Sequence, residues 1–289
     1  MSVLPPSLSR STIVTALRSA GCVFAEDEAE LILSTASSPA ETAAMVRRRA
    51  EGLPLEHVLG WASFHGMRVA VDPGVFVPRR RSEFLVDQAA ATLGNTWHGT
   101  GSRTATVART ATVTATGSRT ARTPVVVDLC CGSGALGAAL ARLLGPVELH
   151  ACDVEPAAVR CARRNLDGVG LAHEGDLFDA LPAGLRGRID VLLANVPYVP
   201  TGDVPLLPAE ARDHEPRVAL DGGEDGLDVM RRVVAAAPGW LAPGGSLLME
   251  TSERQADRAL ATVRDGGLDA RTATSDELWA TVVIGTRPR

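Results

Sequence analysis

Short apolar runs alternate with stretches of helical spacing along the second half of this chain. Apolar runs of four to eight residues are typical of buried strands, whereas apolar residues that recur every three to four positions are typical of amphipathic helices. The runs predict strands at 125–129, 147–152, 189–194, 245–250 and 278–285. The spacing predicts helices at 135–144, 155–166, 227–237 and 252–263. This alternation predicts an α/β fold, in which helices cover both faces of a mostly parallel sheet.

The first sixty residues show helical spacing without strand-like runs. Ser11 and the acidic pair Glu26-Asp27 can begin helices, and the three arginines at 47–49 indicate a helix with a basic end. We therefore expect residues 1–60 to form a small helical N-terminal domain.

Three further segments complete the predicted organisation. In residues 61–94, apolar positions around Gly66 predict a hairpin, followed by a helix from Ser82 that leads into the catalytic domain. Residues 95–123 are rich in threonine, arginine and small residues, contain no acid, and repeat Gly-Ser-Arg-Thr-Ala. Such low-complexity sequence predicts a disordered insertion. Residues 124–289 are predicted to form the catalytic domain.

The composition excludes several classes of protein. Of the 289 residues, 45% are hydrophobic, which is ample for a full core. The net charge is −5, and all 29 basic residues are arginine, so the chain lacks the basic excess of general nucleic-acid binders. The five cysteines match no zinc or haem spacing, which predicts buried thiols in a reducing compartment. With no secretion signal and no membrane-spanning run, we expect a cytoplasmic monomer.

A glycine-rich turn follows the strand predicted at 125–129. Residues 130–134 are Cys-Cys-Gly-Ser-Gly, and the glycines let a ligand approach the backbone at the start of the next helix. Asp153 ends the next strand, where a carboxylate can bind both hydroxyls of a ribose. The pattern predicts a nucleoside-containing cofactor. Because Gly132, Gly134 and Gly137 also satisfy the dinucleotide fingerprint, a nicotinamide oxidoreductase is a real alternative.

The loop after the predicted strand 189–194 carries the only tyrosine of the chain. Asn195-Val196-Pro197-Tyr198 offers a side-chain amide, a backbone carbonyl ahead of a proline, and an aromatic face. Ligands bind at the carboxyl ends of strands in open α/β sheets, so this loop is expected near the cofactor. Its groups suit holding a flat amide or amine while the nitrogen reacts. Asp176, beside Leu177 after a further strand, can face an adenine amine.

Together these motifs resemble the protein-(glutamine-N5) methyltransferases, which modify peptide-chain release factors or a ribosomal protein. The Asn-Pro-Pro-Tyr signature of that family corresponds to residues 195–198, and residues 54–60, 76–79 and 212–227 are similar to segments around it. The resemblance implies a Rossmann-like, seven-stranded class I methyltransferase sheet behind a small helical domain. It also implies S-adenosylmethionine (SAM) as the cofactor.

Motifs and resemblance together nominate the site residues. The expected catalytic residues are the four of the signature, Asn195, Val196, Pro197 and Tyr198. The expected cofactor-binding residues are Asp128, Cys130, Cys131, Gly132, Ser133, Gly134, Asp153, Asp176, Leu177 and Asn195. No metal is expected. The expected partner is a protein with an exposed glutamine, a release factor or ribosomal protein first, without direct contact to nucleic acid or membrane.

Two positions depart from the family pattern. Val196 replaces the first proline of the signature, and Arg81 stands where the family has an acid, as in a related subgroup with Asn-Val/Ala/Thr-Pro-Tyr. Valine keeps the backbone carbonyl, so that carbonyl and the Asn195 side-chain oxygen still offer two acceptors for the two protons of an amide nitrogen. Tyr198 is expected to stack on the amide plane and exclude water.

Two other functions stay open from the sequence. Amino-methyltransferases of adenine or cytosine in nucleic acid use a similar loop, although acids at 203, 210, 213 and 215 disfavour a phosphate-binding face. The other is a SAM-binding regulatory module without catalysis. Val196 and Arg81 slightly favour such a module, whereas the intact Asn195 and Tyr198 disfavour it.

Overall fold

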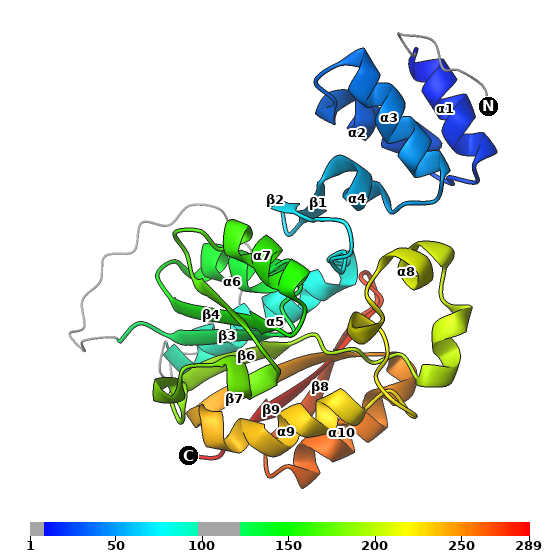
Figure 1. Ribbon diagram of the computed structural model, residues 1–289. Coiled ribbons are helices and arrows are strands. Elements are labelled where there is room, and N and C mark those ends of the chain that lie inside the picture. Colours follow the sequence, from blue (N-terminus) through cyan, green and yellow to red (C-terminus); the bar gives the residue numbers. More distant parts are fainter. Residues whose placement is uncertain (1–8, 98–121) are drawn as a thin grey trace.

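A seven-stranded sheet forms the centre of the computed structural model, which describes residues 9–97 and 122–289 (Figure 1). The strand order is β5-β4-β3-β6-β7-β9-β8. Neighbours from β5 to β7 pair in parallel, and β9 is antiparallel to both β7 and β8. The strands are β3 (Val125–Leu129), β4 (Glu148–Asp153), β5 (Leu171–Glu174), β6 (Ile189–Ala194), β7 (Leu241–Thr251), β8 (Asp269–Ser275) and β9 (Ala280–Thr286). The predicted mostly parallel α/β sheet is confirmed.

Helices cover both faces of this sheet (Figure 1). On one face lie α5 (Glu83–Trp97), α6 (Ala135–Leu144) and α7 (Pro156–Asn165). On the other lie α9 (Asp228–Trp240) and α10 (Ala256–Asp265). Val125 and Val127 of β3 pack on the α9 side and Val126 on the α5 side. Burial on both faces explains why the strands appear in the sequence as continuous apolar runs.

The N-terminal helices have a hydrophobic core of their own. They are α1 (Arg10–Ser19), α2 (Ala25–Thr35), α3 (Pro39–Ala50) and α4 (Leu55–Leu59). The prediction that Ser11 begins a helix was wrong, because Ser9 caps α1 by accepting a hydrogen bond from the Thr12 backbone N–H. Glu26 and Asp27 lie in the first turn of α2, where acidic side chains stabilise the helix by interacting with the positive end of its dipole.

A short hairpin joins these helices to the sheet. Its strands are β1 (Trp61–Phe64) and β2 (Met67–Ala70), paired antiparallel around Gly66. The next helix, α5, begins at Glu83, after a 3₁₀ turn at Arg80–Ser82, and extends to Trp97. Most of the low-complexity segment 95–123 lies outside the described residues, so its predicted disorder stays a prediction.

The chain between β6 and α9 folds into short elements beside the sheet. They are a 3₁₀ helix (Thr201–Leu206), α8 (Ala209–His214) and a 3₁₀ turn (Arg217–Ala219). Figure 1 shows α8 between the sheet and the N-terminal helices. Within the described ranges, no helix is both long and apolar enough to cross a bilayer.

Candidate active site

The carboxyl ends of the central strands meet at one edge of the sheet. Leu129 of β3 is in register with Cys152 of β4 and with Ala194 of β6, so the glycine turn, Asp153 and Asn195 follow side by side. A cavity of about 1010 Å³ opens along this edge, lined by residues of all three loops. Ligand pockets usually occupy ~300–1,000 Å³, so this one has room for a cofactor and part of a second substrate.

The glycine turn leaves space on its cavity side. Gly132 and Gly134 have positive φ angles, 54° and 76°. A Cβ on Gly134 would lie 3.2 Å from that of Ala162 in α7, so this glycine permits the turn to pack on a helix. At Gly132 the nearest atom to such a Cβ is 3.9 Å away, and Gly132 lines the cavity together with Ser133. A ligand can therefore approach the backbone at Gly132 closely, because no side chain stands between them.

Asp153 lies at the wall of the same cavity. Its Oδ2 accepts a hydrogen bond from the Gly132 N–H at 2.8 Å, and its Oδ1 accepts one from the Glu155 N–H at 3.0 Å. Burial raises the pKa of this carboxyl, and the two N–H groups act against that rise. Each carboxylate oxygen has a second lone pair, so Asp153 can still accept from two ribose hydroxyls.

Asp128 and Gly134 are the two nominated cofactor residues that are not among those lining the cavity. Asp128 is fully buried beneath the turn, where its Oδ2 accepts from the Gly137 N–H at 2.9 Å and its Oδ1 has no partner within residues 9–97 and 122–289. Burial raises its pKa to about 7. The geometry gives Asp128 a role under the turn rather than against the ligand.

Asp176 and Leu177 line the far side of the cavity, beyond Asp153. Asp176 Oδ2 accepts from Arg232 at 2.6 Å, and Oδ1 accepts no hydrogen bond from the residues that the structure describes. Leu177 has a positive φ of 48°, which lets its carbonyl accept from the Cys152 thiol at 3.3 Å. Both nominated residues are therefore positioned to contact a cofactor.

Two hydrogen-bond acceptors of the Asn195 loop point to no protein donor. Among the described residues, neither Asn195 Oδ1 nor the Val196 carbonyl accepts a hydrogen bond, and both residues line the cavity. Asn195 Nδ2 donates to Ser82 Oγ at 3.4 Å, and Ser82 donates its own proton to Glu250 Oε2 at 2.6 Å. Because the only proton of Ser82 is used, Ser82 must accept from Asn195. These two hydrogen bonds orient the Asn195 side-chain amide so that its oxygen faces away from Ser82.

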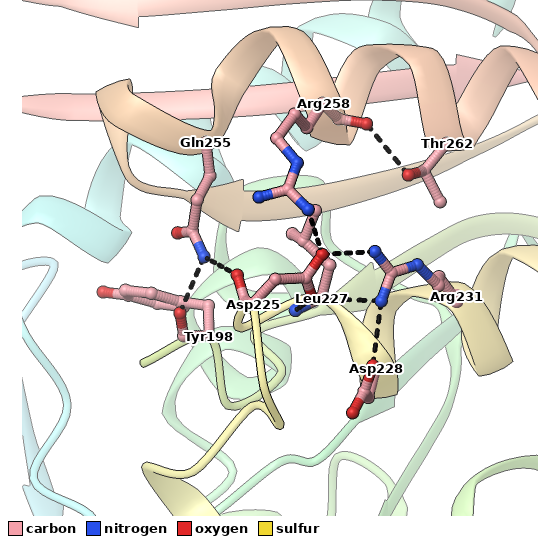
Figure 2. Close-up of polar contacts among 8 residues, drawn as sticks. All are labelled: Tyr198, Asp225, Leu227, Asp228, Arg231, Gln255, Arg258 and Thr262. Atoms are coloured by element: carbon pink, nitrogen blue, oxygen red, sulfur yellow. Dashed lines mark hydrogen bonds and ion pairs between the residues drawn. The ribbon is translucent and has the colours of Figure 1, made fainter. Parts of the chain in front are cut away.

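Tyr198 is held at both ends. Its hydroxyl accepts from Arg81 and donates to Glu250 Oε1 at 3.2 Å. Its carbonyl accepts from Gln255 Nε2 at 3.0 Å, and the second proton of that amide goes to the Asp225 carbonyl at 3.0 Å (Figure 2). Burial and the Glu250 charge raise the pKa of the Tyr198 hydroxyl. The ring is therefore a neutral, fixed wall of the cavity.

Ion pairs with Arg231 and Arg258 fix Asp225, the second residue that Gln255 holds. The Asp225 carboxylate contacts both guanidinium groups and accepts from the Leu227 N–H (Figure 2). The pKa of Asp225 is lowered to about 2, and the hydrogen bond from Arg231 is the largest cause. Gly226 passes so close that a Cβ there would lie 2.3 Å from the Tyr198 carbonyl oxygen. Segment 225–227 thus packs directly against the Asn195 loop.

The sequence did not identify several residues at the acceptor end of the cavity. Phe76, Arg79 and Thr251 line the cavity, whereas Ser82, Glu250 and Gln255 do not line it and hold Asn195 and Tyr198 through hydrogen bonds. Arg79 pairs with the buried Glu215 at 2.6 Å, which fixes the segment before α5 over the cavity. The Thr251 hydroxyl is buried at the cavity wall and has no hydrogen-bond partner in the described part of the chain. The only signal for this group was the similarity of 76–79 to a family segment.

These features fit a nucleoside cofactor. Gly132 lines the cavity without a side chain, Asp153 and Asp176 offer carboxylate oxygens, and the Thr251 hydroxyl at the wall has no hydrogen-bond partner among the described residues. No group of three or more metal-ligating side chains is present in residues 9–97 and 122–289. The five cysteines are free, and four of them are buried, as expected for thiols.

Comparisons with known proteins agree on one kind of enzyme. The methyltransferase small domain profile matches residues 111–206. A release factor glutamine methyltransferase from Geobacter sulfurreducens is 35% identical over 82% of this chain and 75% of its own length. One from Streptomyces coelicolor is 34% identical over 85% and 77%.

Two further proteins are similar to this chain, one in sequence and one in fold. A 4-amino-L-phenylalanine/4-methylamino-L-phenylalanine methyltransferase from Streptomyces pristinaespiralis is 37% identical over 73% of this chain and 65% of its own length. The solved 16S rRNA N2 G1207 methyltransferase of T. thermophilus, in complex with AdoMet and guanosine, has a TM-score of 0.51 at 20% identity. It covers 78% of this chain and 49% of its own, and at that identity the likeness shows the fold alone.

Proposed function

Because this chain belongs to the release factor glutamine methyltransferase family and is a SAM-dependent methyltransferase, we propose that it methylates the side-chain amide nitrogen of a protein glutamine. The observation that carries this proposal is the pair of unused acceptors, Asn195 Oδ1 and the Val196 carbonyl, on the cavity wall. A primary amide nitrogen has two protons and no charge, so it matches two neutral acceptors.

In this proposal the protein accelerates methyl transfer chiefly by positioning the reacting groups. SAM, when bound, supplies an electrophilic methyl group on a sulfonium. Asn195 and Val196 accept the two amide protons and so hold the nitrogen lone pair toward that methyl. With SAM bound, its methyl group would pass to the amide nitrogen held by Asn195 and the Val196 carbonyl, S-adenosylhomocysteine would be the leaving group, and one proton would leave that nitrogen for water. Well-oriented groups reach effective molarities of ~10⁵–10⁸ M, so no strong base is required.

Asp153 and the glycine turn hold the cofactor in this proposal. The Gly132 backbone and Asp153 lie together at the end of β3 and β4, with Asp176 and Leu177 beyond them. Tyr198 closes the acceptor slot beside Asn195, with its ring fixed through Gln255 and Glu250.

A peptide-chain release factor is the first protein substrate to test, with a ribosomal protein second. A nucleobase acceptor is disfavoured, because Glu210, Glu253 and Asp276 line the cavity and would repel a phosphate.

The test is transfer of labelled methyl from SAM into proteins of a lysate, with the modified residue mapped by mass spectrometry. Methylation of a glutamine amide is expected. Asn195→Ala should abolish transfer while SAM affinity, measured by calorimetry, stays within a few-fold, because the interaction serves the reacting centre. Methyl groups mapped only to lysine, arginine or a nucleobase would refute the proposal.

A further inference from the structure

The cavity extends along the sheet edge beyond the Asn195 loop. The other nominated cofactor residues belong to β3, β4, β5 and the turns that follow them, on one side of that loop. The next strands in the sheet are β7, β9 and β8, and residues 251–253, 274–276 and 279–281 at their ends also line the cavity. These residues therefore form a second end of the cavity, which lies away from the expected cofactor site.

Trp279 lies at this second end with its side chain exposed. It is 88% exposed, more than any other large apolar side chain that the structure describes, and it lines the cavity. Its indole has no ring, cation or hydrogen-bond partner among the described residues. Pairing of Ser275 with Ala280 closes the turn 276–279, which fixes where the ring stands. An exposed tryptophan at the mouth of a cavity offers an aromatic face to a ligand.

Two acids accompany Trp279 along the cavity wall. β7 and β9 pair as far as Thr251 and Thr281, and two further residues in that antiparallel register would bring Glu253 to the level of Trp279. Asp276 begins the turn that ends at Trp279. Both acids are exposed, and neither forms an ion pair within residues 9–97 and 122–289.

The arginines of the cavity wall do not compensate these two acids. Arg79, Arg81 and Arg232 line the cavity, and each is paired with another carboxylate. The second end of the cavity therefore attracts a cation. Thr251 adds a polar group at the same end, because the residue is 4% exposed and its hydroxyl has no partner in the described part of the chain. Such a buried group requires explanation, and a ligand with polar atoms can supply the missing partner.

These groups together match the side chain of arginine. A guanidinium is planar and stacks on an aromatic face, while its N–H groups at the edge bind carboxylates. Trp279 offers the face, and Glu253 and Asp276 offer the carboxylates. Charge complementarity of this kind fixes the partner and its register more than it fixes the affinity.

We propose that Trp279, Glu253 and Asp276 form a subsite that binds an arginine side chain of the protein substrate, close in its sequence to the glutamine that is methylated. This inference rests on the proposed glutamine methylation and adds a charged recognition element to it. The glutamine amide itself is small and neutral, so contacts to a flanking residue raise affinity without touching the reacting nitrogen. Asn195 and the Val196 carbonyl keep their task at that nitrogen.

The test compares acceptor peptides that differ by one charge. The probes are capped nonapeptides with a central glutamine among alanines and serines, and with a single arginine at each other position in turn. Each is compared with the same peptide carrying citrulline, which has the shape of arginine without its charge. With labelled SAM, arginine at one or more positions should raise kcat/KM by ~fivefold or more over citrulline, through KM rather than kcat.

Substitutions in the subsite should remove this preference. Trp279→Ala and the double variant Glu253→Gln/Asp276→Asn should each bring the arginine-to-citrulline ratio of kcat/KM to within ~twofold of one. Glu277→Gln is the matched control, because Glu277 is an exposed acid of the same turn that does not line the cavity, and it should keep the wild-type ratio. Calorimetry with SAM should show affinities within ~twofold of the wild type in all variants, because the subsite lies away from the cofactor.

Fluorescence anisotropy of labelled peptides, with S-adenosylhomocysteine present, measures the same preference for peptides that are not methylated. Equal affinities of the wild type for arginine and citrulline peptides overturn the subsite, and so does a preference that survives both variants. A loss of SAM affinity in the double variant would assign the acids to the cofactor and overturn it too. Methyl groups found on arginine instead of glutamine would refute glutamine methylation whether or not the binding preference persists, so the two failures are distinguishable.

Discussion

The Gln255 side chain donates to the Tyr198 carbonyl oxygen at 3.0 Å, which connects the start of α10 to the Asn195 loop. Ser252 fixes which way this amide faces, because its hydroxyl donates to Gln255 Oε1 at 2.5 Å. Both protons of Gln255 Nε2 therefore face carbonyl oxygens, those of Tyr198 and Asp225. Neither contact involves the cofactor.

Gln255→Glu should displace the Asn195 loop and lower kcat. The carboxylate would place an oxygen against two carbonyl oxygens, at nearly the same volume. A displacement of about 1 Å can cost ~10²-fold in rate, so a fall of ten- to a hundredfold in kcat is expected. SAM affinity by calorimetry should change less than a few-fold. Gln88→Glu in α5, outside the cavity, is the matched control. Equal loss of kcat in both variants would show that the contact has no special role.

Ser82→Ala should lower kcat by about tenfold, because Asn195 loses the acceptor that directs its oxygen and Glu250 loses a donor. Ser82→Thr keeps the hydroxyl and should restore most of the rate. Steady-state kinetics of the two variants checks this. A Ser82→Thr enzyme as slow as Ser82→Ala would mean that packing, rather than the hydroxyl, matters at this position.

Asp153→Ala should weaken SAM binding by ~tenfold or more, since a hydrogen bond to a charged group is worth ~1.5–3 kcal/mol. The same substitution frees the Gly132 and Glu155 N–H groups, so Asp153→Asn, which still accepts one of them, is the milder comparison. Calorimetry with SAM and with NAD measures both effects. Unchanged SAM affinity in folded Asp153→Ala, or tighter binding of NAD, contradicts the assignment.

Arg49 should be decisive for the stability of the N-terminal helices. Its side chain is 8% exposed and pairs with Glu28, itself 10% exposed, and with Glu210 of α8. Removing one partner of a buried pair costs ~3–5 kcal/mol, whereas an exposed pair is worth ~0–1 kcal/mol. Arg49→Ala should therefore unfold at lower urea concentration than Glu210→Gln. Similar midpoints for the two variants would contradict the buried pairing.

Asp128 should make the stability of the ligand-free protein depend on pH. Burial raises its pKa from an ordinary 3.8 to about 7, so the folded state binds the proton more tightly than the unfolded chain. The free energy of unfolding should then fall as pH rises from about 4 to about 7. Asp128→Asn removes this contribution. Urea unfolding at pH 5 and pH 8 should show a smaller difference for Asp128→Asn than for the wild type; equal differences would refute the shift.

The central sheet could be predicted from the sequence because its strands are buried on both faces. The predicted ranges 125–129 and 189–194 coincide with β3 and β6. β8 was missed, because its residues are mostly half-exposed or exposed and show no apolar run. β7 begins four residues before its predicted start, across Pro243 and two glycines that resemble a turn. Pairing with neighbours overrides local preference there.

The candidate site was predictable where it follows the strand ends directly. Residues 130–133 of the glycine turn, Asp153 and residues 195–198 all line the cavity. Asp128 was nominated because it adjoins the turn, yet strand alternation turns it away from the cavity. Ser82, Glu250 and Gln255 meet Asn195 and Tyr198 only through tertiary contacts across more than fifty residues, which no local pattern encodes.

The acceptor network draws its members from three distant stretches, so its residues are expected to show strong epistasis. Glu250 contacts Arg81, Ser82 and Tyr198 at once, and a change at Glu250 alone leaves all three unsatisfied. Arg81 differs, because its side chain is partly exposed and shares only two of these bonds. Single substitutions at Arg81 are therefore expected to be tolerated, whereas a substitution at Glu250 is expected to need a compensating change at one of its three donors.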